Sequence, residues 1–69
     1  MDIKSKVGKR IREMREKAEM SQKELAYSSD LDRSYIASVE SGQRNISIVN
    51  LEKIAKSLGV SLSELFKGI

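Results

Sequence analysis

The chain of 69 residues contains no cysteine, no histidine, no proline and no tryptophan. Without cysteine it has no disulfide framework, no thiol nucleophile and no cysteine-ligated zinc. Without histidine it also lacks the commonest metal ligand and the usual general base. A serine hydrolase triad and a zinc hydrolase are therefore excluded, and we expect no enzymatic activity, no metal and no cofactor.

Aromatic residues and long apolar runs are also scarce. Two tyrosines and one phenylalanine are too few for a base-stacking platform, which disfavours binding of single-stranded RNA. No apolar run approaches the ~20 residues of a membrane span, and none resembles a signal peptide. We therefore expect residues 1–69 to form one cytoplasmic domain without membrane contact. A core of this size supplies only about 3–5 kcal/mol, so tight helix packing or a second subunit is expected.

The chain is moderately basic, and its basic residues are concentrated near the N-terminus. Thirteen Lys and Arg oppose ten Asp and Glu, which gives a net charge of +3. Such an excess suits a phosphate backbone, whereas pairs such as Arg12 and Glu16 also fit a solvated helix face. The basic residues within positions 1–20 are Lys4, Lys6, Lys9, Arg10, Arg12, Arg15 and Lys17.

The apolar spacing of the first third of the chain predicts an amphipathic helix over residues 3–18. Apolar residues follow one another at intervals of three or four positions, which places them on one stripe. Gly8 lies inside this helix and costs about 1 kcal/mol of helix propensity, which packing can offset. The stripe consists of Ile3, Val7, Ile11, Met14 and Ala18.

Two short helices follow, joined by a tight turn. Ser21 and Glu24 have the spacing of a capping box, which predicts a helix from Gln22 to about Ser28. Residues 28–31 are weak helix formers with an Asp that tolerates a left-handed backbone. Asp32 is the expected N-cap of the next helix, which runs to about residue 41 and stops at Gly42.

The last third of the chain predicts two more helices. Residues 42–46 read as a polar loop, and Ser47 caps a fourth helix that ends at Gly59. Ser61 and Glu64 repeat the capping-box spacing for a fifth helix. No segment alternates with period two for long enough to predict a strand, so the expected fold is an all-α bundle of five helices. Its last two apolar stripes are Ile48, Leu51, Ile54, Ala55 and Leu58, and then Leu62, Leu65 and Phe66.

Residues 22–41 have the pattern of a helix-turn-helix. The small side chain of Ala26 stands where two steeply crossed helices touch, and apolar residues on both sides fix the pair to the domain. The outer face of the second helix is left polar, which suits the major groove. An ordinary αα-corner is the alternative. The fixing residues are Leu25, Leu31, Ile36 and Val39, and the outer face consists of Arg33, Ser34, Ala37 and Ser38.

Residues ~7–66 resemble a known family. The resemblance lies in the segments IREMREKAEMSQKELA, LDRSYIASVESGQRNIS and LEKIAKSLGVSLSELF. Together they are similar to the Cro/phage-repressor type of helix-turn-helix domain, the lambda repressor-like five-helix DNA-binding fold. Within that family, LDRSYIASVESGQRN is most similar to the controller proteins of restriction–modification systems. Those are dimeric autoregulators made of this domain alone, and a plasmid or phage regulator of the same size fits equally.

The resemblance implies roles for matched positions of the recognition helix, residues 33–41. Gln22 would hydrogen-bond a phosphate, while Arg33 and Ser34 would reach base edges. A guanidinium pairs with O6 and N7 of guanine through two hydrogen bonds, which makes Arg33 the main candidate. Tyr35 and Ser38 would also face the DNA, although Tyr35 suits packing or a phosphate contact equally well.

Further implied positions lie around this helix. Arg44 and Asn45, in the following loop, would contact the DNA backbone or minor groove, with a solvated loop charge as the alternative for Arg44. Arg15 and Glu40 match a structural ion pair that orients the recognition helix in the family.

The chain departs from the family pattern at two positions of the turn. Asp30 stands where a glycine is usual, and Ser29 replaces a more common apolar residue. Asp tolerates the left-handed conformation, so its cost is mild. Neither departure threatens the expected fold.

One recognition helix reads too few base pairs for specificity, which predicts a homodimer on a palindromic operator. The hypothesised interface is isologous. Val49 lies opposite the apolar stripe of its helix, and two apolar residues end the chain. The alternative is that Leu65 and Phe66 close the monomer core. The proposed interface residues are Ile46, Val49, Leu65, Phe66 and Ile69.

The sequence thus predicts a DNA-binding transcription regulator, with a restriction–modification controller protein as its specific form. The alternative is a protein-interaction module, an antitoxin or adaptor that reuses the fold. Activation of transcription would require contact with RNA polymerase, for which acids such as Glu24 and Asp30 are exposed candidates.

Overall fold

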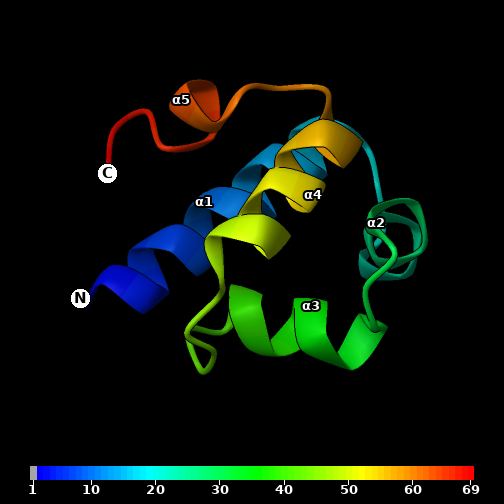
Figure 1. Cartoon of the computed structure of the whole chain (residues 1–69), viewed down its shortest axis with the longest axis horizontal. Helices are drawn as coiled ribbons and strands as arrows, with labels where there is room; N and C mark the ends of the chain where they lie inside the picture. The colour runs from blue at the N-terminus through cyan, green and yellow to red at the C-terminus, as the bar shows by residue number, and fades with distance from the viewer. Residues whose placement is uncertain (1) are drawn as a thin grey trace.

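A computed structural model describes residues 2–69 as five helices joined by short turns (Figure 1). The helix α1 contacts α3 and α5, and α2 contacts α3 and α4. The short helix α3 lies at one edge of the domain, below α1 and α4 in Figure 1. None of the described helices has the length and apolarity that a membrane crossing requires. The helices are α1 (Ile3–Lys17), α2 (Gln22–Ser29), α3 (Arg33–Glu40), α4 (Ile48–Leu58) and α5 (Leu62–Leu65).

The capping residues act largely as the sequence predicts. Ser21 and Glu24 form the reciprocal capping box of α2, and this hydrogen bond from the Ser21 amide holds the pKa of Glu24 below its ordinary value. The hydroxyls of Ser47 and Ser61 accept hydrogen bonds from amides three residues further on. Asp32 is the N-cap residue of α3, but its side chain makes no capping hydrogen bond.

The turn between α2 and α3 accommodates both departures from the family pattern. Asp30 adopts the left-handed conformation, with φ 57° and ψ 43°, and the Leu31 amide donates to the Ala26 carbonyl at 2.9 Å. Ser29 is buried, and its hydroxyl donates to the Leu25 carbonyl at 2.6 Å. Because its polar group is satisfied locally, a serine replaces the usual apolar residue without leaving a buried unpaired hydroxyl.

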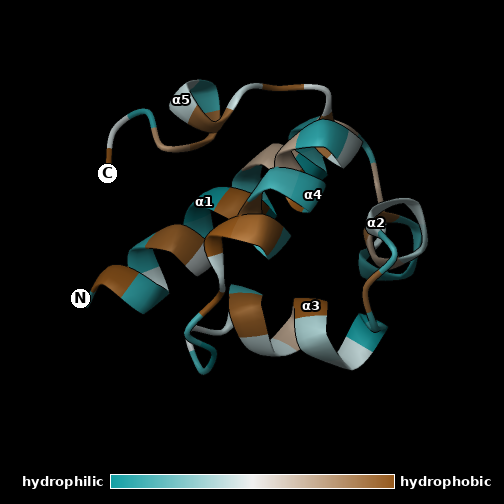
Figure 2. Cartoon of the chain, in the orientation of Figure 1, coloured by the Kyte–Doolittle hydropathy of each residue, from teal (hydrophilic) through white to brown (hydrophobic). Residues whose placement is uncertain are grey.

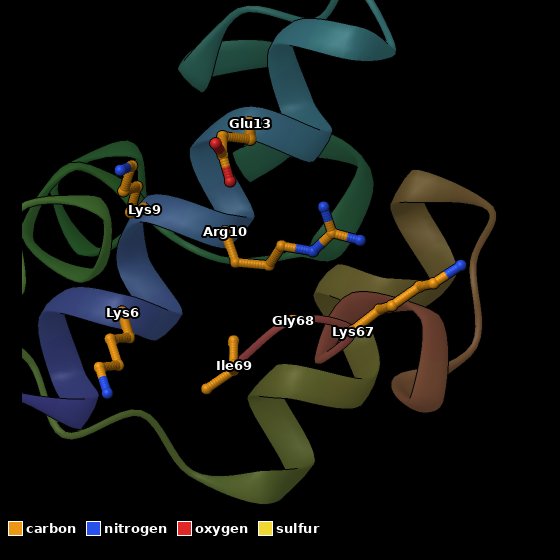
Figure 3. A pocket seen from close by; sticks show the side chains of 7 residues that line it. All are labelled: Lys6, Lys9, Arg10, Glu13, Lys67, Gly68 and Ile69. Atoms are coloured by element: carbon orange, nitrogen blue, oxygen red, sulfur yellow. The ribbon is translucent and has the colours of Figure 1, made fainter.

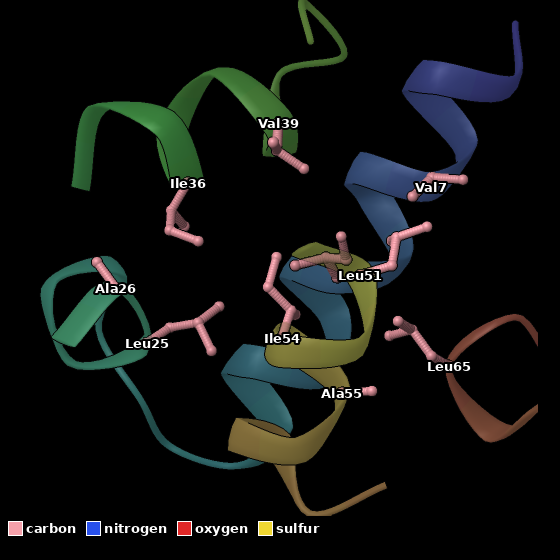
Figure 4. Close-up of a cluster of buried hydrophobic side chains, with 10 residues drawn as sticks. Val7, Leu25, Ala26, Ile36, Val39, Leu51, Ile54, Ala55 and Leu65 are labelled. Atoms are coloured by element: carbon pink, nitrogen blue, oxygen red, sulfur yellow. The ribbon is translucent and has the colours of Figure 1, made fainter. Parts of the chain in front are cut away.

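One apolar core receives side chains from all five helices (Figure 4). Figure 2 shows that apolar residues lie along one side of α1 and α4, whereas the outward side of α3 is pale or hydrophilic. Ile36 and Val39 anchor α3 from its inner side. The buried apolar residues are Val7, Ile11, Leu25, Ala26, Ile36, Val39, Leu51, Ile54, Ala55 and Leu65.

The predicted stripes extend further than the core does. Ile3 and Ile48 are 62% and 64% exposed, and Ala18 is also exposed. All three lie at a helix end, beyond the reach of the neighbouring helices. The apolar stripes therefore continue beyond the buried core, and Ile3 and Ile48 form apolar surface.

Gly8 sets how closely α1 approaches α3. A Cβ atom at this position would overlap the Val39 carbonyl oxygen and meet the Glu40 carbonyl oxygen at 2.8 Å. Both atoms belong to the backbone, so no side-chain rotation relieves the overlap. The sequence shows only the helix-propensity cost of this glycine, whereas the structure shows the contact that requires it.

We expect Gly8→Ala to lower the free energy of unfolding by about 2–3 kcal/mol, because α1 must move away from the end of α3. Urea denaturation followed by circular dichroism measures the effect. Lys9→Ala is the matched control, since Lys9 is the next residue and is exposed. Equal stability of the two variants would contradict the close contact.

Candidate nucleic-acid interface

The N-terminal half of α3 presents free polar groups at the surface. Arg33 and Ser34 are exposed, whereas Tyr35 and Ser38 are half-buried. Among the hydrogen bonds and ion pairs within residues 2–69, none involves the side chain of Arg33. All five donors of its guanidinium are therefore available to an external acceptor.

Tyr35 and Ser38 are held in contacts that link α3 to the following loop and to α4. The Asn50 amide donates a hydrogen bond to the Tyr35 hydroxyl at 3.0 Å. The Arg44 guanidinium lies over the Tyr35 ring, 5.1 Å from its centre, and its Nε donates to the Ser38 hydroxyl at 3.3 Å. Tyr35 can therefore pack inside the domain and still contact DNA. Asn50 uses an acceptor site of the Tyr35 hydroxyl, which leaves the hydroxyl proton free to donate to an external acceptor.

Arg44 is consequently more than a solvated loop charge in this structure. It is exposed, yet the contact with the Tyr35 ring places it beside the outer face of α3. Asn45 is exposed next to it. Asn50 is the member of this group that the sequence does not reveal, since a polar residue near a helix start gives no sign of a contact 15 residues away.

The predicted pair of Arg15 and Glu40 is present and nearly enclosed. The guanidinium donates to both carboxylate oxygens, at 2.7 and 3.1 Å, and the two side chains are only 11% and 4% exposed. A third donor binds the Met20 carbonyl at 2.7 Å. The hydrogen bond with Glu40 raises the pKa of Arg15 above its ordinary value. The pair therefore ties α1 to the end of α3 through two charge-assisted hydrogen bonds.

Gln22 belongs to the same group of contacts. Its amide nitrogen donates to a Glu40 oxygen at 3.2 Å. The family resemblance implies that Gln22 binds a phosphate. In the structure one amide proton is engaged with Glu40, so only the remaining one is available for that contact.

The candidate dimer surface divides between core and exterior. Leu65 is completely buried in its own chain, so assigning it to an interface is wrong; it has no surface to offer a partner. Val49 and Ile69 are 60% and 43% exposed, and Ile46 and Phe66 are half-buried. A groove of about 370 Å³ lies beside the loop, and its apolar lining residues are Ile3, Val7, Ile46, Leu51, Phe66 and Ile69.

Comparison with known proteins agrees with this geometry. Residues 11–65 match the model of the family described as Helix-turn-helix. The chain is 51% identical to the control protein C.MunI of a Mycoplasma species, over 99% of this chain and 93% of that protein. It is 45% identical to the control protein C.BamHI of Bacillus amyloliquefaciens, over 93% of this chain and 80% of that protein.

Solved structures show the same similarity. The restriction-modification controller protein C.AhdI of Aeromonas hydrophila superposes with a TM-score of 0.89 and 49% identity, over 91% of this chain and 96% of that one. The controller protein C.Esp1396I, crystallised as a tetramer with its natural 35 base-pair operator, gives a TM-score of 0.90 and 42% identity. That match covers 97% of this chain and 88% of the other.

We expect Glu40→Gln to lower the free energy of unfolding by about 3 kcal/mol, because it leaves the enclosed charge of Arg15 without a counterion. Glu16→Gln is the matched control. Its carboxylate pairs with Arg12 at 3.3 Å, but both side chains are more than half exposed, so a change within about 0.5 kcal/mol is expected. Thermal and urea unfolding check both values, and equal losses would show that burial of the pair is unimportant.

Proposed function

Because the chain belongs to the helix-turn-helix family, among its restriction–modification controller proteins, we propose that it binds a palindromic DNA operator as a homodimer and thereby regulates transcription. The observation that carries the proposal is the free guanidinium of Arg33 at the exposed start of α3. The orientation of α3 is fixed by the close approach at Gly8 and by the enclosed ion pair of Arg15 and Glu40.

Arg33 is the proposed base reader, with Ser34 beside it. A guanidinium matches the two acceptors of guanine in the major groove and distinguishes this base from the others. The free proton of the Tyr35 hydroxyl suits a phosphate or base acceptor, and Ser38 lies along the same face. Arg44, Asn45 and the remaining amide proton of Gln22 would position the duplex through its backbone.

A single copy is too small to read two half-sites. Its longest dimension is 27 Å, whereas the half-sites of a helix-turn-helix dimer lie ~34 Å apart. Two copies related by a two-fold axis would present one α3 helix to each half-site. The proposed contact surface consists of Ile46, Val49, Phe66 and Ile69, extended by Ile3 and Ile48.

The sign of regulation would follow from the position of the operator relative to the promoter. If the protein activates, Glu24 and Asp30 are exposed acids available to RNA polymerase. Regulation through operator binding includes no enzymatic step, and the protein would act in the cytoplasm, where its operator lies.

The first test is selection of bound sequences from a random DNA pool at a stated salt concentration. We expect an enriched palindrome, and Arg33→Ala should bind it about 10- to 100-fold more weakly and tolerate any base at one position. Arg12→Ala removes the same charge from an exposed site of α1 and should keep the sequence preference. If Arg33→Ala keeps affinity and preference, DNA reading fails and a protein-interaction module becomes the better assignment.

The second test addresses the dimer. Val49→Asp places a carboxylate in the proposed apolar contact, so we expect sedimentation at micromolar concentration to change from dimer to monomer. Folding should persist, because an acid in the first turn of α4 favours that helix. Tyr27→Asp is the matched control, since Tyr27 is a large residue, 90% exposed on α2. Wild-type protein that sediments as a monomer, or a dimeric Val49→Asp variant, would refute this interface.

A further inference from the structure

Arg10 is bonded to the backbone of the C-terminal helix. Its Nε donates to the Leu65 carbonyl oxygen and one of its terminal nitrogens donates to the Glu64 carbonyl oxygen, both at 2.9 Å. Figure 3 shows the side chain extending from α1 towards the C-terminal segment. These are the only side-chain hydrogen bonds within residues 2–69 that join α5 to another helix.

No backbone amide of the described residues donates to the Leu65 carbonyl, whereas the Glu64 carbonyl also accepts from the Lys67 amide at 3.3 Å. A helix leaves its last carbonyl groups without partners inside the helix, and α5 contains only four residues. The guanidinium is a planar fork that reaches both oxygens at once, and its charge also suits the end of a helix. A lysine ammonium keeps the charge but has no fork.

The groove around Arg10 does not have the arrangement of an anion-binding site. It measures about 400 Å³ and is bordered by Lys6, Lys9 and Lys67. Figure 3 shows these three ammonium groups pointing away from one another, so they do not converge on a common anion. The guanidinium is engaged by backbone carbonyl groups instead.

The bonded segment carries part of the proposed dimer surface. Leu65 points into the core, and the next residue, Phe66, lines the apolar groove together with Ile69. Ile46, from the loop beside the recognition helix, lines the same groove. The position of Phe66 against Ile46 therefore depends on where α5 lies relative to α1.

We propose that Arg10 is a positioning residue for dimerisation, which holds α5 so that Phe66 and Ile69 complete the contact surface. The inference rests on the proposed homodimer. It removes Arg10 from the basic residues available to DNA and gives this charge a role on the opposite side of α1 from the contact with α3.

The test compares Arg10→Lys and Arg10→Met with Lys9→Met, which removes a charge from an exposed neighbour. We expect at least a tenfold rise in the dimer dissociation constant for both Arg10 variants by analytical ultracentrifugation, and none for Lys9→Met. Amide hydrogen exchange should accelerate in residues 65–69 more than in α2 and α4. A role in overall stability alone would accelerate exchange in every helix alike.

Ser21→Ala supplies the second control, because it removes the cap of α2 and destabilises the domain without touching α5. At a temperature where every variant is folded, it should dimerise as the wild type does. The inference is overturned if Ser21→Ala raises the dimer dissociation constant as much as the Arg10 variants do. It is also overturned if Arg10→Lys dimerises as tightly as the wild type. In either case the proposed homodimer itself is unaffected. A monomeric wild-type protein would overturn both proposals.

Measurements of DNA binding distinguish this role from the remaining alternative, in which Arg10 contacts a DNA phosphate. If Arg10 instead contacted phosphate, Arg10→Met would lower the slope of log affinity against log salt by about 0.9, while Arg10→Lys would bind like the wild type. That pattern would also overturn the inference. We expect Arg10→Lys to bind half-sites with an unchanged salt dependence and to require more protein to occupy the palindrome.

Discussion

The close contact between α1 and the C-terminal end of α3 determines the orientation of α3 in the domain. The helix α3 has only eight residues, so it depends on its neighbours for its orientation. Gly8 lets the backbone of α1 reach the carbonyl groups of Val39 and Glu40, and the enclosed pair of Arg15 and Glu40 closes the same junction. Both contacts lie on the inner side and at the C-terminal end of α3. The opposite end, with Arg33 and Ser34, is thereby left exposed on a rigid support.

The outer face of α3 is connected to the candidate dimer surface through one short loop. Arg44 lies on Tyr35, and Ile46, two residues later, lines the apolar groove. Asn50 adds a bond from α4 to the same tyrosine. The contacts on the outer face of α3 and the lining of the groove therefore lie within a few residues of each other in this loop.

The positive charge of the chain has several uses. Seven basic residues within positions 1–20 suggest a surface for phosphate, but the structure gives individual partners to three of them. Arg10 holds α5, Arg12 pairs with Glu16, and Arg15 pairs with Glu40. Their charges still contribute to the field around the protein, yet their side chains are engaged in bonds of the domain itself. Among the arginines of residues 2–69, Arg33 lies outside that N-terminal cluster, is exposed, and has no hydrogen bond or ion pair at any of its five donors.

Local sequence determined the helices, because caps and turns are interactions between residues three or four positions apart. The capping box at Ser21, the left-handed turn at Asp30 and the helix end at Gly59 follow from residue chemistry that sequence displays directly. The polar outer face of α3 was predictable from the apolar pattern of residues 22–41, and the pair of Arg15 and Glu40 through the family resemblance. Contacts between distant segments were decided only by the tertiary structure. The choice between core and interface for Leu65, the need for Gly8, and the bonds made by Arg10 and Asn50 all depend on which helices meet, which helix periodicity does not show.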